Sequence, residues 1–89
     1  MEKTYLKINR ADSVVVCLEA MKKGETVEVD GKAITLNQDT PAGHKVLIND
    51  APAGTNIIKY GYPIGHAITD LKAGDWVNEN NLKTNLKGT

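Results

Sequence analysis

Short apolar runs separated by polar turns fill most of the chain, and their spacing is typical of β-strands. The clearest case is the segment 26–36, in which apolar and polar residues alternate on both sides of Asp30-Gly31. Alternation places every second side chain on one face of a strand, and Asp-Gly supplies the positive φ angles of a type I′ turn. The segment therefore predicts a β-hairpin. Its inner-face residues are Val27, Val29, Ile34 and Leu36.

Other apolar runs predict further short strands, for a count of about seven. These runs span residues 4–8, 14–17, 45–48, 56–60, 64–68 and 76–77. The run Val14–Cys17 could begin a helix capped by Ser13, but its three β-branched valines favour a strand. Residues 9–13 have the composition of a turn. The polar stretch 78–89 loses the pattern, so we expect it to fray or to act as a linker.

Glycine turns recur along the chain. Four segments place a glycine three residues before an apolar residue, namely at Gly24, Gly43, Gly54 and Gly74. Glycine accepts left-handed backbone angles where a chain folds back. Together with the short strands, these turns predict an all-β fold with a compact, much-bent body.

Composition narrows the class of function. The 89 residues suffice for one domain with a small core. Eleven basic and eleven acidic residues leave no net charge, and the few aromatic residues do not suit base stacking, so we expect no nucleic-acid partner. No apolar run approaches the roughly 18 residues of a membrane span, and the single cysteine, Cys17, lies in an apolar run as a small buried residue would. We expect a cytoplasmic protein with no membrane contact.

Candidate chemistry is concentrated in residues 43–68, which contain both histidines. His44 follows Gly43 in a turn, where its imidazole could project and exchange protons near neutral pH. It is the candidate catalytic residue, although a surface turn histidine would look the same. Lys45 could pair with a substrate carboxylate as a point charge, but strand lysines mostly lie in solvent.

The segment after these residues carries the other candidates for substrate binding. They are Tyr60, Gly61, Tyr62, Gly65 and His66. A bent loop here could hold an aromatic ring against a sugar or against a partner surface, but tyrosines beside glycines are also common in strand bends. Two histidines without a third ligand are a weak metal signal, so no metal ligand is assigned.

Other polar and aromatic residues have simpler interpretations. Trp76 suits a core or interface position better than a ligand platform. Asp70, Asp75 and Glu79 are expected to be solvated turn charges. No nucleophile motif, phosphate-binding glycine loop or CxxC pair occurs, so we expect no covalent catalysis by this chain alone.

Three segments, taken in order, resemble a known family. They are Pro-Ala-Gly-His-Lys-Val-Leu at 41–47, Ile-Lys-Tyr-Gly-Tyr-Pro-Ile-Gly at 58–65 and Lys-Ala-Gly-Asp-Trp-Val at 72–77. They closely resemble the N-terminal SAF domain of the altronate and galactarate dehydratases, a domain with the β-clip fold. The resemblance implies a SAF domain over residues 1–84 and a polar tail or linker over 85–89.

The same resemblance implies a function. Members belong to hydro-lyases that remove water from a sugar acid, and the SAF domain is joined to a much larger catalytic domain or subunit. If the assembled enzyme binds a divalent metal such as iron or manganese, most of the ligands should come from that larger part. The chain would then be a small subunit, as in relatives acting on sulfolactate, or a piece of a longer enzyme. The alternative is a non-enzymatic SAF module that binds a carbohydrate or caps a protein partner through residues 60–66.

One segment departs from the altronate-type pattern. Altronate-type members carry Val-His-x-His-Asn near the end of the domain, whereas this chain has Val-Asn-Glu-Asn-Asn at 77–81. Galactarate-type members are closer to Trp-Ile-Asp-Glu, which residues 76–79 partly match. The resemblance therefore leaves the particular sugar acid open.

Overall fold

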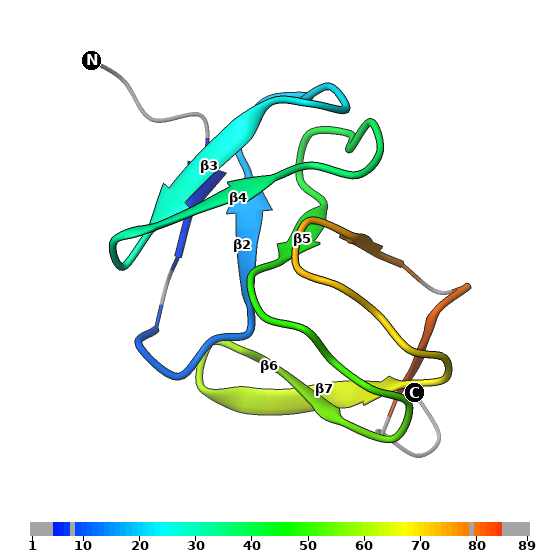
Figure 1. The fold of residues 1–89 in the computed structure, drawn as a ribbon. Helices are drawn as coiled ribbons and strands as arrows, with labels where there is room; N and C mark the ends of the chain where they lie inside the picture. Colours follow the sequence, from blue (N-terminus) through cyan, green and yellow to red (C-terminus); the bar gives the residue numbers. More distant parts are fainter. Residues whose placement is uncertain (1–4, 8, 79, 85–89) are drawn as a thin grey trace.

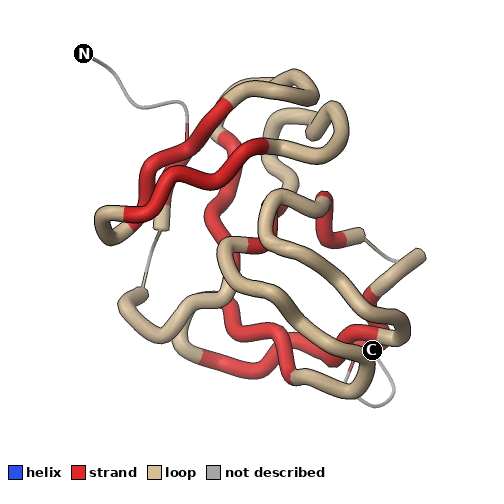
Figure 2. Tube along the Cα trace, in the orientation of Figure 1, coloured by secondary structure: helices blue, strands red, loops and turns tan. Residues whose placement is uncertain are grey.

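The computed structural model describes residues 5–7, 9–78 and 80–84, and these residues form strands and turns with no helix (Figures 1 and 2). The prediction of an all-β body built from short strands and glycine turns is confirmed. The strands of the described residues are β1 (Tyr5–Leu6), β2 (Val14–Cys17), β3 (Thr26–Val29), β4 (Lys32–Thr35), β5 (Lys45–Leu47), β6 (Asn56–Lys59), β7 (Tyr62–Ala67), β8 (Trp76–Val77) and β9 (Leu82–Thr84).

A central antiparallel sheet lies between two hairpins. The sheet has the order β1-β2-β5-β8, the hairpin β3–β4 forms a sheet of its own, and β6, β7 and β9 form a third sheet. Figure 1 shows the β3–β4 hairpin at the top, the β6–β7 hairpin at the bottom, and β2 and β5 between them. Each face of the central sheet is thus covered by one hairpin.

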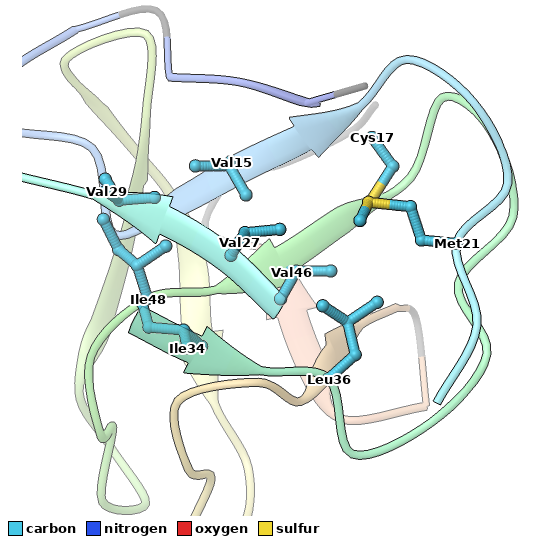
Figure 3. Close-up of a cluster of buried hydrophobic side chains, with 9 residues drawn as sticks. All are labelled: Val15, Cys17, Met21, Val27, Val29, Ile34, Leu36, Val46 and Ile48. Atoms are coloured by element: carbon cyan, nitrogen blue, oxygen red, sulfur yellow. The ribbon is translucent and has the colours of Figure 1, made fainter. Parts of the chain in front are cut away.

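This arrangement produces two hydrophobic clusters, one on each face of the central sheet. Under the β3–β4 hairpin lie Val15, Cys17, Met21, Val27, Val29, Ile34, Leu36, Val46 and Ile48 (Figure 3). Under the β6–β7 hairpin lie Val14, Leu47, Ala51, Ile57, Ala67, Leu71 and Val77. Because alternate residues of β2 and β5 supply the two clusters, both strands are apolar throughout most of their length.

The predicted hairpin has the predicted turn. Asp30 and Gly31 have φ angles of 51° and 80°, as a type I′ turn requires. The second hairpin turns at Tyr60-Gly61 with nearly the same angles, 55° and 80°. The four residues expected on the inner face of the first hairpin are all buried.

The two halves of the chain repeat the same backbone hydrogen bonds about 30 residues apart. Gly24 N–H donates to the Leu36 carbonyl at 2.9 Å, and Gly54 N–H donates to the Ala67 carbonyl at 2.7 Å. The isolated bridges 21–40 and 51–71 correspond in the same way. The repeated glycine turns in the sequence therefore mark a structural repeat, and each repeat contributes one hairpin.

Three expectations from the sequence need correction. The described residues form nine strands where about seven were expected, and part of the stretch expected to fray is ordered, because Leu82–Thr84 forms β9 and pairs with β7. The predicted tail, 85–89, lies outside the described residues, as does Glu79.

Asp70 and Asp75 are more than solvated charges, since their carboxylates accept backbone N–H groups of Ala53 and Lys72 at 2.9 and 2.8 Å.

Cys17 is a free, buried thiol in the first cluster, as predicted. Burial, and secondly the charge of Glu25, raise the pKa of this thiol. A protonated, enclosed thiol is a poor nucleophile.

Nowhere in the described ranges is there a helix of the length and hydropathy that crossing a bilayer demands.

Candidate functional site

His44 lies on the surface, at the turn that leads into β5. Gly43 has a φ angle of 82°, and His44 N–H donates to the Pro41 carbonyl at 3.2 Å, which closes the turn. The histidine carbonyl in turn accepts the Cys17 N–H at 2.8 Å, which fixes the backbone to the last residue of β2. The side chain is exposed, as the sequence predicted.

Trp76 holds the imidazole of His44. Its indole Nε1–H donates to His44 Nδ1 at 3.2 Å, and the two rings meet edge to face with centroids 5.4 Å apart at an interplanar angle of 76°. Trp76 was expected only to be a core or interface residue. It belongs to the site, and the register of β8 against β5 is the feature that brings it there, which no local sequence signal reveals.

Lys45 lies on the other face of the central sheet. In the antiparallel register, Lys45 is paired with Val77 and Val46 with Trp76. Successive strand residues point to opposite faces, so Lys45 shares the face of the buried Val77, whereas Trp76 shares the face of Val46. The imidazole that Trp76 holds therefore lies on the opposite face from the Lys45 side chain.

Lys45 is partly shielded from solvent and lies within the influence of a second positive charge, that of Lys59. The residue is half-buried at the margin of the second cluster. Burial, and secondly the charge of Lys59, lower the pKa of Lys45. In the part of the chain that the structure describes, neither lysine has a carboxylate partner. Lys59, which the sequence interpretation did not include, instead stands over the Tyr60 ring, 4.7 Å from its centroid.

The tip of the β6–β7 hairpin presents two tyrosines to solvent. Tyr60 and Tyr62 are 48% and 73% exposed. The tip is held from below by Asp12, which is buried and accepts the Gly61 N–H at 2.8 Å and the Asn9 N–H at 3.0 Å. Asp12 was also missed, because a single aspartate in a turn gives no signal of burial. The backbone of the tip is thus tied to the turn that contains Asp12, and both tyrosine rings lie on the surface.

Gly65 and His66 lie in the middle of β7, away from this tip. Gly65 is buried against β9, and a Cβ atom there would meet the Lys83 carbonyl oxygen at 2.4 Å. This close packing accounts for the glycine without a ligand. His66 is paired in register with Asn56 of β6 and Lys83 of β9. It therefore belongs to the third sheet and not to the central sheet that carries His44. The substrate contacts predicted for both residues stay predictions.

The predicted site residues thus fall into three places. His44 lies with Trp76 on the face of the central sheet that carries Val46, Lys45 lies on the opposite face within the influence of the Lys59 charge, and His66 lies on the third sheet. Within the described ranges, no three side chains of the His, Cys, Asp or Glu type are grouped so as to hold a metal ion. These residues do not fit a metal centre of their own.

A hollow of about 670 Å³ beside β1, lined by Tyr5 and Lys7 among others, contains none of the predicted site residues.

These features define a small all-β domain of two repeated hairpins with one imidazole held outward on a glycine turn. The chain belongs to the altronate/galactarate dehydratase SAF domain family, whose model matches residues 3–85. The predicted resemblance is therefore confirmed.

Curated relatives agree with this assignment. The chain is 45% identical to an altronate dehydratase of Escherichia coli (strain K12) over 82 residues, which are 92% of this chain and 17% of that protein. It is 37% identical to an altronate dehydratase of Bacillus subtilis (strain 168) over 84 residues, or 94% and 17%. It is also 39% identical to the (2R)-sulfolactate sulfo-lyase subunit alpha of Paracoccus pantotrophus over 51 residues, 57% of this chain and 76% of that subunit.

The chain therefore spans about a sixth of the length of the altronate dehydratases that it matches. The matched part is the N-terminal region of those enzymes. The sulfo-lyase subunit alpha, in contrast, is matched over most of its length. Domains of this family thus occur both within long chains and in a short subunit.

Proposed function

We propose that this chain is the N-terminal domain or small subunit of a sugar-acid dehydratase, and that His44 contributes to an active site completed by a larger catalytic chain. The observation that carries the proposal is the exposed imidazole, fixed by Trp76 on a Pro-Ala-Gly turn, in a chain of the dehydratase SAF family. Altronate and galactarate are the candidate substrates, because the matching family is described by these two acids.

The side chains present in this domain indicate which catalytic groups it can supply and which must come from the larger chain. Removal of water beside a carboxylate needs a base for the carbon-bound proton and assistance for the departing hydroxide. The described residues offer one exposed, anchored imidazole and form no cluster of metal ligands. A larger chain must therefore supply the remaining groups, including any iron or manganese ion. We expect the 89 residues alone to have no dehydratase activity.

A domain exchange tests this proposal. The matched 17% of the E. coli altronate dehydratase would be replaced by this chain, and keto-deoxy acid formation from altronate and galactarate would be compared with the same enzyme lacking that segment. We expect the chimera to be active and the truncated enzyme to be inactive or nearly so. A folded chimera that is no faster than the truncated enzyme on either acid would overturn the proposal.

The exposed tip of the β6–β7 hairpin favours a second candidate, a module that caps a protein partner without contributing to chemistry. Tyr60 and Tyr62 are rigid amphipathic side chains of the type enriched at interfaces. This candidate predicts that the chimera depends on the hairpin tip, with losses on changing Tyr62 to serine, and is indifferent to replacement of His44.

A further inference from the structure

The contact between Trp76 and His44 determines which imidazole nitrogen can carry a proton. An indole nitrogen only donates hydrogen bonds. Because Trp76 Nε1 lies 3.2 Å from His44 Nδ1, Nδ1 must be the acceptor and cannot itself carry a proton while the bond exists. The proton of the neutral ring is then on Nε2.

Trp76 is itself held by three polar neighbours. Its backbone N–H donates to Gln38 Oε1 at 2.9 Å, and its carbonyl accepts the side-chain amides of Asn78 and Asn81 at 3.1 and 2.8 Å. Its partner on β5, Val46, is completely buried. The backbone of Trp76 is therefore held by hydrogen bonds to three side chains, and this backbone presents the indole donor beside His44.

The other imidazole nitrogen is available to a ligand. No hydrogen bond joins Nε2 of His44 to any residue in the described part of the chain, and the side chain is exposed. An N–H group at this position recognises an oxygen with lone pairs, such as that of a carboxylate or an alkoxide.

We propose that Trp76 is a positioning residue that fixes His44 in the Nε2–H tautomer, so that His44 acts as a hydrogen-bond donor to a carboxylate oxygen of the sugar acid and does not act as its base. The part of this statement that concerns the sugar acid rests on the proposed function. The part that concerns the tautomer is a property of this chain alone.

The chemistry of dehydration gives such a donor a use. When a base removes the proton beside a carboxylate, negative charge moves onto the carboxylate oxygens before the C–O bond breaks. A donor placed at one of those oxygens stabilises the charge as it develops. The base, and the group that assists the departing hydroxide, would then come from the larger chain.

Nitrogen NMR of the imidazole tests the tautomer directly. The His66→Gln variant leaves His44 as the single histidine of the chain, so its two ring nitrogens are unambiguous at about pH 8, where free imidazole is largely neutral. We expect one protonated nitrogen, Nε2, and one acceptor, Nδ1. Adding Trp76→Phe, which keeps an aromatic ring but removes the donor, should move both signals toward the averaged values of free imidazole. A protonated Nδ1, or signals that Trp76→Phe leaves unchanged, would overturn the proposal.

A second measurement does not depend on the folding of the Trp76 variant. The chain has one tryptophan, so its indole N–H gives one signal, and His44→Phe removes the acceptor while leaving Trp76 in place. We expect the indole proton to exchange with water about two- to tenfold faster, the effect of losing one ordinary hydrogen bond. Thr55→Ala, which alters the matching residue of the other Pro-Ala-Gly turn, should leave the rate unchanged. Equal rates in all three chains would count against the contact.

These readouts keep the two proposals separable. The NMR signals are measured on the 89-residue chain without substrate or partner. If they show the Nε2–H tautomer and the chimera is inactive, the proposed function fails and the inference on Trp76 stands. If the chimera is active but the tautomer is Nδ1–H, the chain is a dehydratase domain in which His44 presents an acceptor at Nε2.

Discussion

His44 and Lys45 are neighbours in the chain but lie in opposite environments. His44 is exposed and bound by Trp76, whereas Lys45 is half-buried, and burial together with the charge of Lys59 lowers its pKa. A strand places adjacent side chains on opposite faces. Two neighbouring residues of a strand are therefore expected to point into different surroundings. The two residues should therefore be tested as separate features.

Lys45 should reduce the stability of the chain at neutral pH. Its pKa is lowered in the fold by burial and then by Lys59, so the folded state disfavours the charged form. Below the lowered pKa both states hold the proton and the cost is complete. As the pH rises from that value to the ordinary lysine value, the folded state releases its proton first and the cost disappears. We predict that Lys45→Met raises the melting temperature at pH 7 and that this advantage shrinks in alkaline solution.

Lys23→Met is the matched control for that experiment, because Lys23 is exposed in a turn of the same repeat architecture. Its melting temperature should stay close to that of the parent chain at each pH. A Lys45→Met variant that melts at the same temperature as the parent, or below it, would show that the buried part of this lysine is not under electrostatic strain.

Asp12 should stabilise the tip of the second hairpin from below. Its carboxylate accepts two backbone N–H groups, those of Gly61 and Asn9, and it is buried. Replacing it with alanine leaves both donors without an acceptor, so we predict a loss of about 1–3 kcal/mol in the free energy of unfolding. Urea unfolding measures the loss, and hydrogen exchange at the Gly61 amide should accelerate. Asp12→Asn, which keeps one acceptor oxygen, should lose less; equal losses for both variants would argue against this account.

The elements that could be predicted from the sequence are those whose signal is local. The β3–β4 hairpin follows from alternation around Asp30-Gly31, and β2 follows from its run of valines, because a strand buried on both faces needs no polar alternation. The strand β9 could not be predicted, since Leu-Lys-Thr is too short and too polar to differ from a loop. It is a strand because β7 offers it an edge, which is a tertiary effect.

The glycine turns look alike in sequence but differ in how closely the chain packs around them. A Cβ atom on Gly24 would meet nothing within 4 Å, whereas one on Gly74 would meet the Thr35 carbonyl oxygen at 2.2 Å. Both glycines have positive φ angles, of 92° and 98°. Gly24→Ala should cost about 1–2 kcal/mol from backbone strain alone. Gly74→Ala should cost clearly more, because the β4 backbone must also move. Urea unfolding of the two variants decides this, and equal costs would contradict the packing.

At the scale of the molecule, the two hairpins cover the faces of one sheet and so distribute the predicted site residues. The family, the all-β class and the exposure of His44 could be predicted from the sequence. The parts played by Trp76, Lys59 and Asp12 could not, because each depends on strand register or on burial across the repeat. A larger chain that uses both His44 and the hairpin tip would have to contact more than one face of this domain.

The measurement that tests the central claim most directly is the turnover of the chimeric dehydratase carrying His44→Ala beside the one carrying Thr55→Ala. The two residues occupy the same position in two Pro-Ala-Gly turns, and each closes its turn through its backbone N–H, so the comparison isolates the imidazole. If His44 contacts the reacting sugar acid, its loss should lower kcat by about a hundredfold, and the Thr55 variant should match the parent chimera. Equal turnover in the two variants would contradict the account and leave this chain as a module that caps its partner.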